Sequence, residues 1–425
     1  MLAKRIWVAV ILLGFSGQLA WAVENQFFNT FMYDRITPDP RPISWMVAAS
    51  AITATVASIL MGALSDRTRS RWGVRRPYIL LGYIAWGVFT ALYPTAAFLQ
   101  PMGLAVTMAI LFDSLMTFCG STANDAAFNA YVADITTVHN RGRVVGVVQL
   151  LTWVALLVVY GGAGPFIQSF GYDLFFYILG GVVILFGLIG GALMREAPPP
   201  ARPERSFAAH LAGTFRWKSL RENRDLLLVL LAMGLWGVAQ QIFFPYLIIY
   251  LNHFLKLPTA QASLLIFVAI LVGGILASYP VGLLVDRWGR RQLAIVTVVA
   301  EVVGLSLFSL ARSLPALAVT AILWLTPITA WMISVGAWSK DLFPEDKRGQ
   351  FAGYVILFSV AFTMVPGPLL GGWLATQYGI PTVIDGRAGF IPTPIIFQAA
   401  AAATILAIVP LLATGRRPSV SPPAS

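Results

Sequence analysis

Long apolar segments alternate with short polar segments along the whole chain. Twelve apolar segments follow one another, and each can form a helix across the hydrocarbon core of a bilayer, which needs about 20 residues. The expected spans are 6–31, 43–64, 78–98, 103–133, 144–167, 172–193, 226–251, 259–284, 293–311, 315–339, 350–375 and 391–413. This pattern predicts an all-α polytopic membrane protein.

The polar segment between the sixth and seventh spans is longer than the others, rich in proline and carries seven Lys/Arg. It predicts two six-helix halves, residues 1–193 and 226–413, joined by a cytoplasmic linker at 194–225. Residues 414–425 are rich in Pro and Ser and are expected to form a disordered tail.

The N-terminus imitates a secretory signal, with Lys4 and Arg5 before an apolar run and Ala20-Trp21-Ala22 as a possible cleavage site. The apolar run continues to about Phe31. We therefore expect an uncleaved first membrane helix.

Composition narrows the class of protein further. The 425 residues are 58% hydrophobic and 11% charged, whereas a soluble domain has about 25% charged residues. This excludes a soluble enzyme or a disordered chain and argues against a nucleic-acid partner. The single Cys119 and the three scattered histidines offer no disulfide framework or metal ligand set, and no cofactor is expected.

The net charge of +11 fits the loops of a membrane protein. With both termini in the cytoplasm, 24 of the 29 Lys/Arg fall on the cytoplasmic side, as the positive-inside rule requires. We expect a multi-pass protein of the cytoplasmic membrane with this orientation.

Several motifs occur twice, once in each half. Gly-x-x-x-Asp-Arg begins at Gly62 and recurs at Gly282, and Ala-x-x-x-Asp-x6-Arg-Gly-x-x-x-Gly begins at Ala130 and recurs at Ala337. The same order at equivalent helices indicates duplication of a six-helix unit.

Two such halves with these loops resemble the major facilitator superfamily. Residues 61–77, with their Asp-Arg pair and Arg-Arg-Pro ending, are similar to the glycoside–pentoside–hexuronide cation symporters and the related sucrose-type transporters, as is Ala-Tyr-Val-Ala-Asp at 130–134. The resemblance implies a twelve-helix alternating-access fold and secondary active transport of a sugar or glycoside with H+ or Na+. The aspartates that helix two carries in the Na+-coupled relatives are replaced here by Ala54 and Ser58, which favours H+.

Ionisable groups at membrane depth are costly unless they face a cavity or a partner. Glu24 in the first span, Asp113 and Asp125 in the fourth and Glu301 in the ninth are such groups. Glu24 is the first candidate for proton coupling or solute binding, with a structural carboxylate as the alternative. A structural role is favoured for Glu301, but its function stays open.

Polar and aromatic side chains at helical spacing accompany these carboxylates. Amides and indoles can bind hydroxyl groups of a solute, or they can hold helices together. The candidate solute-binding or proton-coupling residues are Gln18, Trp21, Glu24, Asn25, Asp113, Asn124, Asp125, Asn129, Trp236, Gln240 and Gln241.

The duplicated loop motifs place opposite charges at the cytoplasmic helix ends. Such pairs can lock an inner gate in one state and break in the other, or they can simply stabilise each half. The candidate gate residues are Asp66, Arg67, Arg75, Arg76, Asp134, Arg141, Asp286, Arg287, Arg290, Arg291, Asp341 and Arg348.

The sequence therefore favours a carrier of a small polar solute, a sugar or glycoside, coupled to H+ rather than Na+. Its expected partners are this solute, the ion and the lipid bilayer. A lysolipid, amphiphile or drug carrier of the same fold is one alternative, and a nontransporting nutrient sensor is another. A membrane enzyme is disfavoured because no nucleophile–base pair is evident. The oligomeric state stays open, and a monomer is consistent with the sequence.

Overall fold

The computed structural model describes residues 3–137, 140–196, 221, 223–343 and 354–415. Most of the expected linker, candidate gate residue Arg348 and nearly all of the expected tail lie outside the described residues. The side chain of Asp286 also lies outside them.

The first half contains six spans, some of which combine several helical segments. Its elements are α1 (Lys4–Val23), η1 (Glu24–Phe28), α2 (Asn29–Phe31), η2 (Met32–Ile36), α3 (Pro40–Ser65), α4 (Arg76–Leu92), η3 (Tyr93–Phe98), α5 (Met102–Gly120), η4 (Ser121–Phe128), α6 (Asn129–Asp134), α7 (Arg141–Phe170) and α8 (Tyr172–Leu193).

The second half repeats this plan and adds a two-stranded hairpin. Its elements are α11 (Arg224–Phe243), η5 (Phe244–Tyr246), α12 (Leu247–Ile249), η6 (Tyr250–Phe254), α13 (Thr259–Ala269), η7 (Ile270–Leu276), α14 (Ala277–Trp288), α15 (Arg290–Leu310), α16 (Leu314–Asp341), η9 (Leu357–Ala361), α18 (Phe362–Met364), α19 (Pro366–Gln377), β1 (Ile380–Ile384), β2 (Arg387–Ile391), α20 (Ile395–Ile405) and α21 (Ile408–Ala413).

The twelve expected spans are confirmed. Within the described residues, 12 helical stretches are long and apolar enough to cross a membrane. The predicted start of the last span was wrong, because residue 391 belongs to β2 and the helix begins at Ile395. The Asp385–Gly386 turn, with both φ angles positive, is the usual signal of a tight hairpin and was missed.

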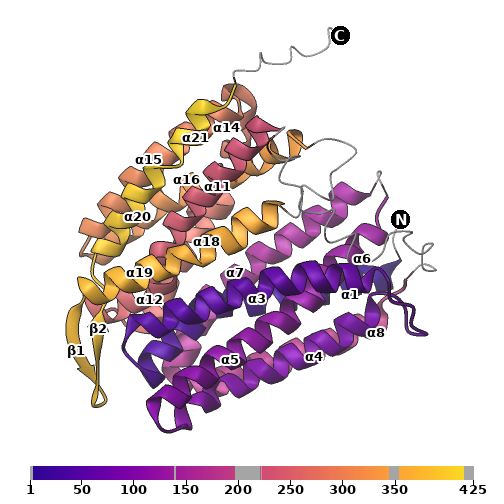
Figure 1. Cartoon of the computed structure of the whole chain (residues 1–425), viewed down its shortest axis with the longest axis horizontal. Coiled ribbons are helices and arrows are strands. Elements are labelled where there is room, and N and C mark those ends of the chain that lie inside the picture. The colour runs from indigo at the N-terminus through magenta and orange to yellow at the C-terminus, as the bar shows by residue number, and fades with distance from the viewer. Residues whose placement is uncertain (1–2, 138–139, 197–220, 222, 344–353, 416–425) are drawn as a thin grey trace.

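The two halves lie side by side and diverge toward the end of the molecule that carries both chain termini (Figure 1). They pack together through α3 on α19 and through α7 on α13. The α3–α19 contact is close, since a Cβ added at Gly372 would lie 2.9 Å from the Cβ of Ser44. Small residues permit such helix contacts in membranes.

A network of polar contacts joins the halves at the opposite end, which we call the closed end. Asp34 in η2 accepts a hydrogen bond from Tyr172 at 2.7 Å and pairs with His253 of the second half at 2.8 Å. The guanidinium of Arg387 in β2 donates to the backbone carbonyls of Asp34, Arg35 and Ile36. The hairpin therefore connects the second half to the end of the first span through hydrogen bonds, and we call this connection the strap.

Replacing Arg387 with Ala should loosen the closed end, because three backbone carbonyls of the first half lose their donor. Spin labels on Cys at Arg35 and Lys256, both exposed, would report the separation of the halves. We expect a broader distance distribution shifted to larger values. Arg41→Ala is the matched control, since Arg41 pairs with Asp39 inside the same half; equal distributions in both variants would contradict the strap.

Candidate solute and proton site

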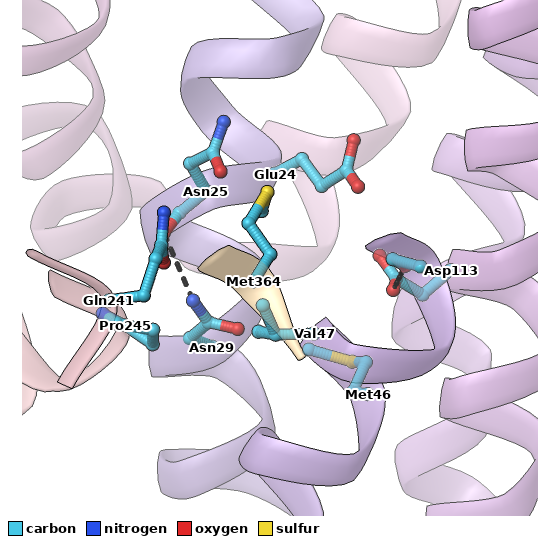
Figure 2. A pocket seen from close by; sticks show the side chains of 10 residues that line it. Glu24, Asn25, Asn29, Met46, Val47, Asp113, Gln241, Pro245 and Met364 are labelled. Atoms are coloured by element: carbon cyan, nitrogen blue, oxygen red, sulfur yellow. Dashed lines mark hydrogen bonds between the residues drawn. The ribbon is translucent and has the colours of Figure 1, made fainter. Parts of the chain in front are cut away.

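A pocket of about 310 Å³, including its open mouth, lies between the two halves near the middle of the spans. Figure 2 shows acidic and amide groups from the first span facing residues of the seventh and eleventh spans. Its lining residues are Glu24, Asn25, Asn29, Met46, Val47, Ser50, Asp113, Gln241, Pro245 and Met364. Four of the eleven predicted site residues, Glu24, Asn25, Asp113 and Gln241, thus meet at one site.

A row of oxygen atoms connects the two carboxylates of this pocket. The Thr117 hydroxyl lies 2.9 Å from Oε1 of Glu24 and 3.2 Å from Oγ of Ser50. Ser50 in turn donates a hydrogen bond to Oδ2 of Asp113. Three spans, represented by η1, α3 and α5, contribute to this row.

Each carboxylate also keeps one oxygen without a partner. Oε2 of Glu24 and Oδ1 of Asp113 are buried and accept no hydrogen bond in the structure, and Asp113 is only 2% exposed. Buried acceptors without donors are unfavourable. A proton or a solute hydroxyl group that binds to these oxygens would therefore give the largest gain in hydrogen-bonding free energy.

The amides of the pocket are held by their own helix. Asn25 donates to the carbonyl of Trp21 at 2.7 Å, and Asn29 donates to the carbonyl of Asn25 at 3.0 Å. The π-helical turn at η1 widens the helix here, as such turns often do at functional sites. Oδ1 of Asn29 is buried and unpartnered, so it remains available as an acceptor.

Three other predicted site residues of the fourth span, Asn124, Asp125 and Asn129, do not line this pocket. Asn124 donates to Asp125 and accepts from the Tyr83 hydroxyl of α4, at 3.1 and 3.2 Å. Asn129 is exposed and bonds to the Asp125 carbonyl. At a regular helical spacing of eleven residues, Asn124 would lie near the face of Asp113; the π-helical η4 changes the helical phase after Gly120, and Asn124 contacts Tyr83 instead of lining the pocket.

Trp21 and Gln18 also lie apart from the pocket lining. Trp21 packs against Trp86 with ring centroids 4.8 Å apart, beside the Asp125 carboxylate. Gln18 lies half-buried farther along α1. Trp21 and Asp125 therefore lie together within the first half.

In the second half, the structure joins Glu301 to two predicted site residues. Trp236 Nε1 donates to Oε2 of Glu301 at 2.7 Å, and Gln240 Nε2 donates to Oε1 at 2.5 Å. Trp236 stacks on Trp331 of α16 at 5.2 Å. Trp236 and Gln240 therefore face the ninth span, while the adjacent Gln241 faces the pocket.

The duplicated loop motifs make equivalent contacts inside each half. Arg75 pairs with Asp66 at 2.5 Å and with Asp134 at 3.3 Å, and Arg290 likewise pairs with Asp341. These ion pairs lie within a half, and they support the stability of each bundle. A gating role for them remains a prediction.

The neighbouring arginines are equivalent as well. Arg76 donates to the carbonyl of Ala192 at the end of α8, and Arg291 donates to those of Leu411 and Leu412 at the end of α21. Both guanidinium groups thus cap the last helix of their own half. Arg67, Arg141 and Arg287 belong to the same helix ends, where their proposed gating role is untested.

Glu196 was missed by the sequence analysis. Its carboxylate accepts hydrogen bonds from the backbone N–H groups of Val74, Arg75 and Arg76 at 2.5–3.1 Å, which fixes the loop between the second and third spans. Ser50 and Thr117 were missed too, because lone hydroxyl residues in apolar helices usually bond to their own backbone.

Comparison with known sequences gives the family. A profile of the Major Facilitator Superfamily matches residues 6–278 and 255–425. The chain belongs to the major facilitator superfamily. The fold and family together make it a multi-pass membrane protein.

Solved structures share the superfamily fold. Nucleoside transporter NupG aligns with a TM-score of 0.71 at 13% identity, covering 98% of this chain and 100% of that chain. The xylose transporter XylE from E. coli, in an inward open conformation, aligns with a TM-score of 0.70 at 13% identity, covering 98% and 97%. At these identities the likeness concerns the fold alone.

Two curated relatives match only in part. Multidrug resistance protein 2 of Bacillus subtilis is 25% identical over 156 residues, which is 36% of this chain and 35% of the relative. The multidrug efflux pump Tap of Mycolicibacterium fortuitum is 28% identical over 183 residues, 43% and 41% of the two chains. The chain thus matches about two fifths or less of these relatives.

Thr117→Val should destabilise the fold, because the buried Glu24 carboxylate loses its hydroxyl donor. We expect the free energy of unfolding to fall by about 1–3 kcal/mol, measured by denaturant unfolding in mild detergent. Thr122→Val is the matched control, since the Thr122 hydroxyl bonds only to the Phe118 carbonyl of its own helix. Equal losses in both variants would show that Thr117 contributes nothing through Glu24.

Proposed function

We propose that this chain is a secondary active transporter that moves a small, hydroxyl-rich solute by alternating access and couples its movement to H+. The observation that carries the proposal is the Glu24–Thr117–Ser50–Asp113 row in a pocket lined by both halves. Glu24 and Asp113 together form the proton site.

The hydrogen-bond count along the row favours a single proton. With both carboxyls ionised, Thr117 donates to Glu24 and Ser50 donates to Asp113, and no proton lies between the two hydroxyl oxygens. A proton on Glu24 lets its O–H donate to Thr117, Thr117 to Ser50, and Ser50 to Asp113. One proton therefore completes a continuous chain between the carboxyls, and hydroxyl groups can serve as both donor and acceptor.

The free energy of burying charges in the membrane also favours one bound proton. Two negative charges in a low-dielectric pocket repel each other and are poorly solvated. Proton uptake removes one of these charges, and solute hydroxyl groups can donate to the oxygens that remain without partners. Proton and solute binding thus reinforce each other, as symport requires.

The solute class is proposed from the pocket and supported by the solved relatives. Asn25, Asn29 and Gln241 supply neutral amides, and Met46 and Met364 supply apolar contacts. This mixture suits a sugar or nucleoside. NupG and XylE are named for such solutes, and residues 61–77 resemble glycoside symporters.

Drug or amphiphile efflux is the second candidate, since the curated relatives are multidrug proteins and several pocket residues are apolar. A nontransporting sensor has no specific observation in its favour. We further propose the cytoplasmic membrane as location, with both termini in the cytoplasm and the closed end outside, on the basis of the Lys/Arg distribution.

Ligand binding can separate these solute classes. Thermal unfolding of the purified chain would be measured with sugars, glycosides, nucleosides, lysolipids and cationic drugs. A ligand at 100 times its Kd adds about 2.7 kcal/mol to the native state. A dose-dependent shift with sugars or nucleosides is expected; a shift with drugs or lysolipids alone would overturn the solute class and leave the fold intact.

Glu24→Gln and Asp113→Asn should uncouple transport from the proton gradient, because the row then lacks one of its two acid groups. In proteoliposomes with the solute found above, we expect accumulation driven by a pH gradient to disappear while solute exchange remains. Asp173→Asn, in the first turn of α8 and outside the pocket lining, is the control and should accumulate normally. Full accumulation by Glu24→Gln, or accumulation driven by Na+ but not H+, would refute the proposed coupling.

A further inference from the structure

Glu301 forms a second buried acid site, separate from the pocket. It lies on α15 and is 0% exposed. Its two oxygens accept hydrogen bonds from Trp236 and Gln240 of α11, at 2.7 and 2.5 Å. A carboxylate held only by neutral donors at this depth has no obvious structural advantage over an amide.

Charged groups of the described residues lie far from this carboxylate. The elements packed against α15 are α14, α16, α20 and α21, and α20 and α21 contain no charged residue. The charged residues of the other elements lie at helix ends. Arg291, for example, is ten residues from Glu301 in the sequence, which is about 15 Å along the helix. Apart from Glu301, the charged residues with described side chains in α11, α14, α15, α16 and the loop between α15 and α16 are Arg224, Asp225, Arg287, Arg290, Arg291, Arg312, Lys340 and Asp341. The one tyrosine of these elements, Tyr279, is 77% exposed.

The two partners differ in what they can do. An indole N–H donates only, so Trp236 always requires an acceptor. The Gln240 amide carries both donor and acceptor, and its Oε1 is buried without any partner. Gln240 as a whole is 9% exposed. The site therefore contains one hydrogen-bond acceptor without a donor, Oε1 of Gln240, beside the Glu301 carboxylate.

We propose that Glu301 is a second proton-binding site, at which protonation turns the Gln240 amide over. When ionised, the carboxylate accepts from Trp236 and from Nε2 of Gln240. When protonated, its O–H donates to Oε1 of the reversed amide, while Trp236 still donates to the other oxygen. The proton thus replaces one N–H···O bond by one O–H···O bond, so that Oε1 of Gln240 gains a donor while its Nε2 gives up its acceptor on Glu301.

The Gln240 amide that turns over is directly connected to the solute pocket through the backbone. Gln240 adjoins Gln241, which lines the pocket, and both lie in the last turn of α11 before the break at η5. The second half therefore holds an acid group of its own, related to the pocket through the backbone of one helical turn. The proposal concerns proton binding and stands independently of the proposed coupling at Glu24 and Asp113.

Infrared difference spectroscopy of the purified full chain, between alkaline and acidic buffers, tests the proposal. A protonated carboxyl absorbs through its C=O stretch, which a carboxylate lacks. We expect a C=O band that disappears in Glu301→Gln and persists in Glu24→Gln and Asp113→Asn. Its persistence in these two variants separates this site from the pocket, whether or not the pocket itself takes up a proton.

Two further variants keep the test decisive if Glu301→Gln does not fold. Trp236→Phe should move the band to higher frequency, since the carboxyl loses one hydrogen bond. Gln240→Leu should also move it, because the O–H loses its acceptor. A spectrum with no band assignable to Glu301 over the pH range in which the protein stays folded would overturn the proposal, as would a band unaffected by both variants.

Discussion

The unfavourable free energy of burying polar groups away from water is the constraint on which this structure depends. A chain with 11% charged residues can place acids at membrane depth only where other groups of the protein replace water. Glu24 and Asp113 obtain hydroxyl donors, whereas Glu301 obtains an indole and an amide. These acids meet neutral dipoles rather than cations, in contrast to the arginine pairs at the helix ends. Charge is thus neutralised by salt bridges near the surface and solvated by dipoles inside.

Irregular helical turns decide which residues meet. The π-helical turn η1 begins at Glu24, and η4 follows directly after α5, which carries Asp113 and Thr117. Such a turn shifts every later side chain around the helix axis. The turn η1 places Asn29 in the pocket with Glu24. The turn η4 directs Asn124 toward Tyr83. The shape of the site therefore depends on departures from regular helix geometry as much as on the residues themselves.

The sequence predicted the spans, the two halves and the family, because each rests on patterns repeated over many residues. It also identified Glu24 and Asp113, since an acid in an apolar run is conspicuous. Regular spacing put Asn124 near the face of Asp113, but Asn124 lies in η4, which alters the helical phase, and it bonds to Tyr83 instead of lining the pocket. Ser50, Thr117 and Glu196 act through partners distant in the sequence, and the pairing of Glu301 with Trp236 and Gln240 likewise required the packing of α15 on α11.

The hairpin between the eleventh and twelfth spans has a consequence for how the protein tolerates sequence change. Arg387 binds backbone carbonyls of residues 34–36 rather than their side chains, and the Phe390 N–H binds the carbonyl of Pro38. A carbonyl is present whatever residue occupies the position. Substitutions at Arg35 or Ile36 therefore leave these attachment points in place, and the contribution of the hairpin to the connection between the halves depends mainly on the backbone path of the first span and on the Arg387 guanidinium group.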